Sequence, residues 1–218
     1  MSESLGAFER QARRIGALAL LITLSTILWG VFQGLRRPAG RTAGQPERIM
    51  NARAYFAIGI PYFGACALLW RPLPLTLSHP ARIAALILGA LLYFPGLALV
   101  LWGRLTLGRM YNVSSSFGAQ LYADQQLITH GPYALVRHPM YLGVLVASFG
   151  GLLLYRTWTL VFTTINFLAL IVRARREEQA LAAEFGEQWE AYRLRVPAFF
   201  NLNPRAWPVL WRFLATGK

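Results

Sequence analysis

The chain has 218 residues, of which 56% are hydrophobic and only 14% are charged, a balance that argues against a soluble domain. Its formal net charge of +13 comes from 21 arginines and one lysine that are scattered between apolar runs. Basic residues in such places set membrane orientation and contact anionic headgroups, so the charge does not indicate nucleic-acid binding. The single cysteine, Cys66, excludes an intrachain disulfide and argues against a thiol catalyst or a metal cluster.

Apolar segments divide the chain in a way that predicts an all-α integral membrane protein. Three of them have about 20 residues, enough to cross a hydrocarbon core about 30 Å thick. With two shorter segments they predict about five transmembrane helices, at residues 15–35, 54–70, 83–102, 140–154 and 158–172. The first segment follows Arg10, Arg13 and Arg14 and resembles a signal peptide, but it is too long for one and is interpreted as a retained span.

Polar stretches separate these spans, and the last piece of the chain has its own pattern. The longest connection, 104–131, includes Ser114-Ser115-Ser116 and has no clear period, as functional loops often do. Beyond the fifth span, apolar residues recur at helical spacing over 173–196, which predicts an amphipathic helix along the membrane surface. The residues of its apolar face are Leu181, Phe185, Trp189, Tyr192 and Val196.

The distribution of basic residues predicts the orientation of the five spans. If the C-terminus is cytoplasmic, 16 basic residues lie on the cytoplasmic side and six on the other. The positive-inside rule therefore places the C-terminal helix and the stretch Gly131–Gly143 together on the cytoplasmic face, which in a bacterium is a face of the inner membrane.

Two polar motifs at that face are the candidates for chemistry. The first is Arg137-His138-Pro139, between two tyrosines, and the second is Arg173-Ala-Arg-Arg-Glu-Glu178. The structural alternative is that such arginines snorkel to the headgroups and that the histidine only makes a structural hydrogen bond. Arg173 and Glu177 are i, i+4 neighbours that could pair, whereas Glu178 has only Arg175 at i−3. Two adjacent carboxylates gain nothing from an anionic lipid surface, so the second motif favours a functional reading.

These motifs resemble those of the isoprenylcysteine carboxyl methyltransferase family and its phospholipid methyltransferase relatives. The first reads Gly131-Pro-Tyr-x-x-x-Arg-His-Pro-x-Tyr-x-Gly143. After an apolar hairpin comes Arg173-x-x-x-Glu-Glu178-x-x-Leu-x-x-x-Phe-Gly-x-x-Trp-x-x-Tyr-x-x-x-Val-Pro197. The resemblance covers about a third of the chain, and Trp189 stands where many members have Tyr. It implies a multi-span helical enzyme that uses S-adenosyl-L-methionine, with residues 1–126 as membrane spans and polar loop and 127–218 as the cofactor-binding region.

The resemblance also implies roles for individual residues. Glu178 would hold the amino-acid end of the cofactor, and Arg173 would be the catalytic residue that orients the acceptor. The C-terminal helix would cover a cofactor pocket on the cytoplasmic face, and no metal is implied. The full set of implied cofactor-binding residues is Tyr133, Arg137, His138, Tyr141, Glu177, Glu178 and Tyr192.

The acceptor can be weighed by its ionisation. A carboxylate with a pKa of about 3.5 is already a nucleophile at pH 7, whereas a thiol near 8.5 or an amine must first lose a proton. This favours a carboxylate acceptor, although His138 or Glu177 could serve as a base. Together with the resemblance, it makes carboxyl O-methylation of an isoprenylcysteine-like, lipophilic or lipidated substrate the first expectation. The alternatives are S-methylation of a small thiol, N-methylation of a phospholipid headgroup, and a non-catalytic membrane protein such as a small transporter or assembly factor. Membrane lipids are expected partners in every case.

Overall fold

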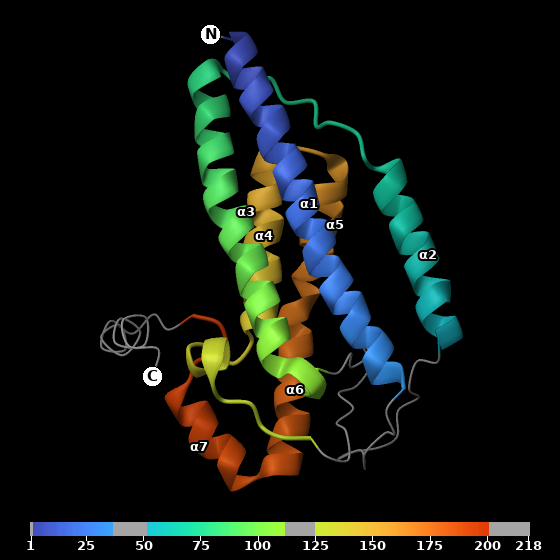
Figure 1. Cartoon of the computed structure of the whole chain (residues 1–218), viewed down its shortest axis with the longest axis vertical. Helices are drawn as coiled ribbons and strands as arrows, with labels where there is room; N and C mark the ends of the chain where they lie inside the picture. Colours follow the sequence, from blue (N-terminus) through green and yellow to red (C-terminus); the bar gives the residue numbers. More distant parts are fainter. Residues whose placement is uncertain (1, 37–51, 112–124, 201–218) are drawn as a thin grey trace.

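The computed structural model describes residues 2–36, 52–111 and 125–200, and these parts of the chain are helical (Figure 1). Two short 3₁₀ turns, η1 (Gly108–Met110) and η2 (Gly131–Ala134), lie between the third and fourth α-helices. The α-helices are α1 (Ser2–Leu35), α2 (Ala52–Leu68), α3 (His79–Leu107), α4 (Pro139–Tyr155), α5 (Trp158–Phe167), α6 (Ala169–Phe185) and α7 (Glu187–Arg195).

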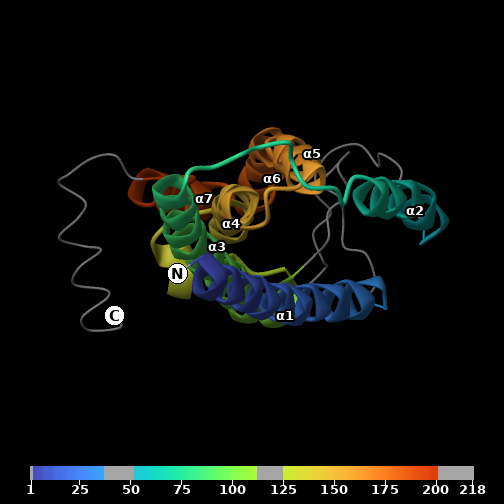
Figure 2. The ribbon, with the colours of Figure 1, turned by 90° about the horizontal axis from the view of Figure 1, so that it is seen from above.

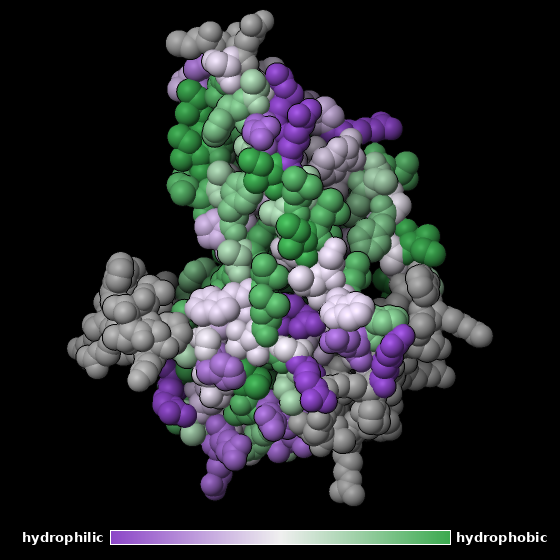
Figure 3. Space-filling model, in the orientation of Figure 1, coloured by the Kyte–Doolittle hydropathy of each residue, from purple (hydrophilic) through white to green (hydrophobic). Residues whose placement is uncertain are grey.

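Within the described residues, three stretches of helix are long and apolar enough to cross a membrane, as expected for the predicted all-helical membrane protein. They are Ser4–Gly34, His79–Met110 and Trp158–Phe185, and the last of these joins α5 to α6. Two shorter apolar helices, Ala57–Leu68 and Pro139–Tyr155, lie between them in the chain. Figure 3 shows apolar side chains gathered in a broad band over this face, with hydrophilic side chains above and below it. Whether the two shorter helices also cross the membrane stays a prediction.

The core of the bundle is the pair α3 and α4, with α1 against one side and α5 and α6 toward the other (Figure 2). Small residues bring α3 and α4 into backbone contact. A Cβ atom on Gly96 would lie 2.6 Å from the backbone N of Ala147, and one on Gly143 would lie 2.6 Å from the carbonyl oxygen of Gly96. Membrane helices associate through such close contacts, because lipid removes the hydrophobic drive between them. The packing fixes the N-terminus of α4, and with it His138, against the C-terminal half of α3.

The C-terminal helix differs from the prediction of one continuous helix over 173–196. The backbone of Gly186 has φ +48°, a conformation that ends a helix and favours glycine, so α6 stops at Phe185 and α7 folds back (Figure 1). The predicted apolar residues do pack together, but across the bend between the two helices. Trp189, Tyr192 and Val196 are buried, with Leu127, Leu181, Ala182 and Phe185 packed against them.

One predicted span begins earlier in the structure, and parts of two predicted connections lie outside the described residues. Helix α1 begins at Ser2, 13 residues before the predicted span, because the polar residues ahead of Ile15 continue the same helix. Residues Ser114-Ser115-Ser116, and most of the connection 36–53, lie outside the described residues.

Candidate functional site

The polar site is built around His138, the residue just before the first turn of α4. Pro139 occupies the first helical position, where its missing N–H costs no hydrogen bond. The imidazole is 5% exposed and stacks on the ring of Tyr141 at 5.5 Å between centroids, with the planes 4° apart. The ring of Phe199 lies 5.5 Å away on a tilted plane. His138 is therefore held in one orientation by two aromatic rings.

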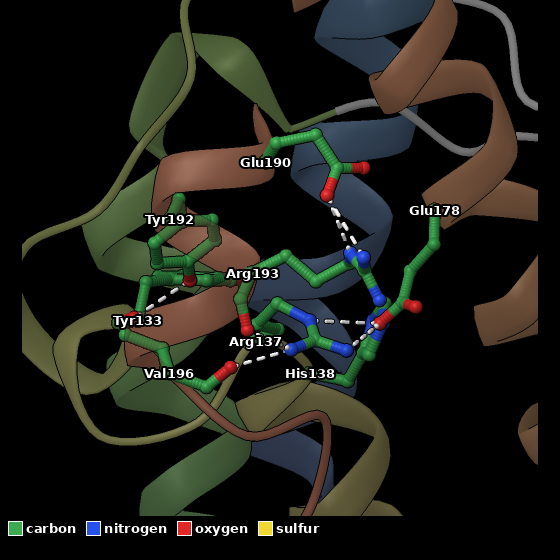
Figure 4. Close-up of polar contacts among 8 residues, drawn as sticks. All are labelled: Tyr133, Arg137, His138, Glu178, Glu190, Tyr192, Arg193 and Val196. Atoms are coloured by element: carbon green, nitrogen blue, oxygen red, sulfur yellow. Dashed lines mark hydrogen bonds and ion pairs between the residues drawn. The ribbon is translucent and has the colours of Figure 1, made fainter. Parts of the chain in front are cut away.

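Glu178 of α6 meets His138 and Arg137 (Figure 4). Nε2 of His138 lies 2.9 Å from Oε1 of Glu178, and Nε and Nη2 of Arg137 each lie 2.9 Å from the same oxygen. The Glu178 side chain is 21% exposed. In the parts of the chain that the structure describes, Oε2 of Glu178 accepts no hydrogen bond. We call this group of three the His138–Glu178 cluster. Glu178 thus pairs across the hairpin and not with Arg175, the partner that helix geometry alone offered.

Arg137 also binds backbone carbonyls at the end of α7. Its Nη1 donates to the carbonyl oxygen of Arg193 at 3.0 Å and to that of Val196 at 2.5 Å. The backbone N–H of Arg137 donates to the carbonyl oxygen of Pro197, and that of His138 donates to Ala198. The cation also satisfies carbonyls at the C-terminus of a helix, where the dipole favours positive charge. The side chain of Arg137 therefore joins α6 to the end of α7.

Tyr133 and Tyr192 form a second buried pair beside this cluster (Figure 4). The Tyr192 hydroxyl donates to the backbone carbonyl of Tyr133 at 2.7 Å, and the Tyr133 hydroxyl donates to the carbonyl of Gly103 on α3 at 3.5 Å. Burial raises the pKa of both phenols well above the ordinary value, so both stay neutral donors. Their hydroxyls are directed at backbone carbonyls, and the structure does not bring them to Glu178.

Glu177 and Tyr141 make a separate polar contact next to the His138–Glu178 cluster. The Tyr141 hydroxyl donates to Oε2 of Glu177 at 2.7 Å. The guanidinium carbon of Arg173 lies 5.8 Å from the centroid of the Tyr141 ring. Since Tyr141 stacks on His138, one aromatic ring separates the Arg173 side of the site from the Glu178 side. The adjacent carboxylates of α6 thus serve two different sets of partners.

Comparisons with known proteins bear directly on these motifs. A family described as phospholipid methyltransferase matches residues 84–188. The chain is 36% identical, over 37% of its length, to a protein-S-isoprenylcysteine O-methyltransferase of Schizosaccharomyces pombe, and 31% identical, over 59%, to methanethiol S-methyltransferase 2 of Bradyrhizobium diazoefficiens. It is 38% identical, over 34%, to a probable protein-S-isoprenylcysteine O-methyltransferase of Oryza sativa subsp. indica. These matches support a membrane methyltransferase similar to the isoprenylcysteine O-methyltransferases.

These matches confirm the resemblance predicted from the two motifs. The matched region, 84–188, runs from α3 to the start of α7 and so contains His138, Glu178 and the hairpin between them. The matches cover 35%, 51% and 41% of the lengths of the three relatives. The chain thus spans between about a third and a half of these proteins.

Some residues of the site were not predicted from the family motifs. Phe199 packs on the His138 ring, and its only signal was its place just beyond the Val196-Pro197 end of the second motif. The contacts of Arg137 with the carbonyls of Arg193 and Val196 had no signal, because backbone carbonyls carry none in a sequence. Arg137 was predicted to bind cofactor, and the structure shows it bound to protein groups.

Proposed function

We propose that this chain transfers a methyl group from S-adenosyl-L-methionine to a lipophilic acceptor, with the carboxylate of an isoprenylcysteine-like substrate as the first candidate. One observation carries the proposal. His138 and Glu178 are 40 residues apart in sequence, on opposite sides of the hairpin from α4 to α6, yet they lie 2.9 Å apart. Both lie within the region 84–188 that the family model matches. A purely structural anchor at a membrane surface does not need a buried histidine held between two aromatic rings against a carboxylate.

The residues present fit the amino-acid end of the cofactor. Glu178 binds Arg137 and His138 through Oε1, and the Oε2 of this partly exposed side chain would accept hydrogen bonds from an ammonium group. Arg137 holds Glu178 in place and keeps it ionised, so that the carboxylate is ready before the ligand arrives. Tyr133 and Tyr192 would form the wall on the α7 side. When bound, the cofactor would supply an electrophilic methyl group on a sulfonium.

The Arg173 side of the ring of Tyr141 suits the acceptor. A guanidinium can hold a carboxylate through two parallel hydrogen bonds, which positions its oxygen for attack. The acceptor oxygen would form a bond to the methyl carbon as the carbon–sulfur bond breaks, and no proton has to move. Alignment of the three atoms then supplies most of the rate, and the protein provides it by positioning. Glu177 fixes Tyr141 between the two halves of the site.

S-methylation of a thiol is the second candidate, because the match to methanethiol S-methyltransferase 2 extends over 134 residues, more than the 83 residues of the fission yeast match. A thiol would have to lose its proton, and Glu177 or His138 would be the candidate base. N-methylation of a phospholipid headgroup is the third, supported by the description of the matching family. The remaining rival is a membrane protein without catalysis, in which the cluster only joins α4, α6 and α7.

The placement in the membrane is also a proposal. All five apolar helices would cross it, which leaves the His138–Glu178 cluster on the same side as the C-terminus. The excess of arginines in the connections on that side supports a cytoplasmic location, in a bacterial inner membrane. The division into 1–126 for the membrane region and 127–218 for the cofactor region stays a prediction.

Purified protein in detergent, supplied with radiolabelled S-adenosyl-L-methionine, tests these candidates. The acceptor panel would be a farnesylcysteine, a short alkyl thiol and phosphatidylethanolamine, and we expect label on the farnesylcysteine carboxylate. Label only on the thiol or the amine would select the second or third candidate. The matched variant is Arg173→Lys, which keeps the charge but loses the bidentate geometry, and we expect it to lower turnover more than cofactor affinity. No transfer to any acceptor, together with no binding of S-adenosylhomocysteine, would leave the non-catalytic rival.

A further inference from the structure

A second charged cluster lies at the other end of the bundle, far from the His138–Glu178 cluster. Its centre is Glu9 of α1, which is buried and only 3% exposed. Arg13 of the same helix lies 2.5 Å from Oε1, and Arg156, in the turn between α4 and α5, binds the same oxygen. Arg82 of α3 donates from Nε and Nη2 to Oε2. We call these four residues the Glu9 cluster. Nothing in the matched motifs or in the proposed methyl transfer uses it.

The position of the cluster along the helices corresponds to one border of the hydrocarbon. On α1 no charged residue stands between Arg14 and Arg36, and on α3 none stands between Arg82 and Arg104. The members of each pair are 22 positions apart, which at 1.5 Å per residue is about 33 Å. This matches a hydrocarbon core of about 30 Å. The Glu9 cluster therefore lies at the level of the lipid phosphates.

The cluster has more positive charge than it can neutralise. Three guanidinium groups face one carboxylate, so the group carries a net charge of +2. The side chains of Arg13, Arg82 and Arg156 are 34%, 38% and 17% exposed. Within the described residues, the Nη1 atoms of Arg13 and Arg82 make no hydrogen bond. Unneutralised charge next to hydrocarbon is costly, and an external anion at this depth would lower that cost.

We propose that the Glu9 cluster binds the phosphate of an anionic phospholipid in the leaflet opposite the His138–Glu178 cluster. Phosphate oxygens accept from free guanidinium N–H groups in the geometry that arginine favours. Farther along α1 toward the hydrocarbon, the apolar side chains Ile15 and Leu18 are 48% and 61% exposed, so this helix presents apolar surface to acyl chains. A lipid satisfies both the charge and the apolar surface, whereas a free phosphate ion would satisfy only the first.

Lipid binding by the full chain in dodecylmaltoside tests this proposal by native mass spectrometry. Phosphatidylglycerol and phosphatidylcholine with the same acyl chains would be titrated separately, and we expect phosphatidylglycerol to bind roughly tenfold more tightly, as one or two charge-assisted hydrogen bonds would give. A third titration adds sn-glycerol 3-phosphate as competitor. Equal binding of the two lipids would overturn the proposal. Displacement of the lipid by millimolar sn-glycerol 3-phosphate would overturn the lipid as the source of the phosphate.

The variants separate a lipid site from a purely structural joint. Arg82→Gln should weaken phosphatidylglycerol binding roughly tenfold, and Arg82→Lys should weaken it less because the charge remains. Glu9→Gln raises the net charge of the cluster to +3 and should bind phosphatidylglycerol at least as tightly as the natural chain. Arg10→Gln is the matched control, since Arg10 is an exposed arginine one turn from Arg13 outside the cluster. It should change binding less than twofold.

Two outcomes of this series would contradict the proposal. If Arg10→Gln weakened binding as much as Arg82→Gln, the lipid would be attracted only by the general charge of that end. If Glu9→Gln weakened it as much as Arg82→Gln, the ordered joint rather than the excess charge would be responsible. Size-exclusion chromatography and the helical circular-dichroism signal show which variants are folded. If Arg82→Gln does not fold, Arg82→Lys replaces it in the comparison of binding affinities. The assay does not depend on methyl transfer, so its result stands apart from the proposed enzyme activity.

Discussion

Each end of the bundle holds one carboxylate among cations, and the two differ in how fully the carboxylate is used. Glu9 is 3% exposed and both of its oxygens are bound, by arginines from α1, from α3 and from the turn after α4. Glu178 is 21% exposed and binds Arg137 and His138 through one oxygen. An enclosed carboxylate with all its oxygens occupied joins helices. A partly open one with an unused oxygen can still take a ligand.

The arginines of the two clusters also differ in how fully their N–H groups are bound. At the Glu9 end the arginines outnumber the acid and keep N–H groups for an outside anion. At the Glu178 end Arg137 is 10% exposed, and its Nη1 donates to the backbone carbonyls of Arg193 and Val196 at the end of α7. In the two proposals above, the first cluster therefore offers positive charge to a lipid, and the second offers negative charge to a ligand. The comparison predicts that the two ends fail in different ways when they are altered.

The largest effect is expected where both ends are disturbed together. Gly96→Leu puts a side chain where even a Cβ atom would lie 2.6 Å from the backbone of Ala147, so α3 and α4 must separate. Because that pair carries His138 at one end and Arg82 and Arg156 at the other, we expect a loss of more than about 3 kcal/mol and little folded protein. Gly64→Leu is the control, since a Cβ there meets nothing within 4 Å. Thermal melts in detergent compare the two, and equal melts would show that α3 and α4 do not pack this way.

Glu178→Ala should affect ligand binding much more than folding. Loss of one charge-assisted contact to an ammonium weakens binding by about 1.5–3 kcal/mol, so S-adenosylhomocysteine should bind roughly 30-fold more weakly. The melting temperature should fall only slightly, because Arg137 keeps its backbone partners and Glu178 is partly exposed. Calorimetric titration and a thermal melt on the same sample measure both. Unchanged affinity would remove Glu178 from the cofactor site.

Glu9→Ala should show the reverse pattern. It leaves three arginines without their common partner, and we expect a loss of about 2–3 kcal/mol, below the range for fully buried pairs because Arg13 and Arg82 are about a third exposed. The affinity of the folded fraction for S-adenosylhomocysteine should stay within about twofold. Glu190→Ala, which removes a pair that is about half exposed on both sides, is the stability control and should leave the melt unchanged. If Glu9→Ala abolished ligand binding at full stability, the two ends would be coupled.

The sequence could predict the meeting of the two motifs but not the network that joins them. The turn residues around His138, the length of the apolar hairpin and the position of Glu178 sufficed to place both residues at one end of the bundle. The pairing of Glu178 with Arg137 depends on the packing of α6 against the start of α4, which local spacing does not encode. The Glu9 cluster was missed for the same reason, because its residues are distributed over 9–156 and its arginines were counted only as orientation signals.

The break between α6 and α7 shows a different limit. The apolar period continues through Phe185 and Trp189, so it indicated one helix and concealed the bend. Gly186 was the available signal, since glycine often ends a helix in the left-handed region. The apolar face was predicted correctly, because Trp189 and Leu181 do pack together, but the direction of α7 was not. Periodicity reports which residues are buried and not whether the helix that carries them is straight.

Tyr192→Phe should give the smallest effect and sharpen the comparison at the Glu178 end. It removes the hydrogen bond to the carbonyl of Tyr133, and we expect a loss of about 1 kcal/mol with wild-type affinity for S-adenosylhomocysteine. Burial raises the pKa of Tyr192 above its ordinary value of 10.0, so the hydroxyl contributes fully below pH 10 and its contribution falls as pH rises above that value, where the unfolded phenol ionises. The variant should therefore lose stability less steeply than the natural chain above pH 10. The hydroxyl of Tyr133 makes a longer, 3.5 Å hydrogen bond, so Tyr133→Phe should lower the free energy of unfolding less. A larger loss than for Tyr192→Phe would show that α7 is held mainly through Tyr133.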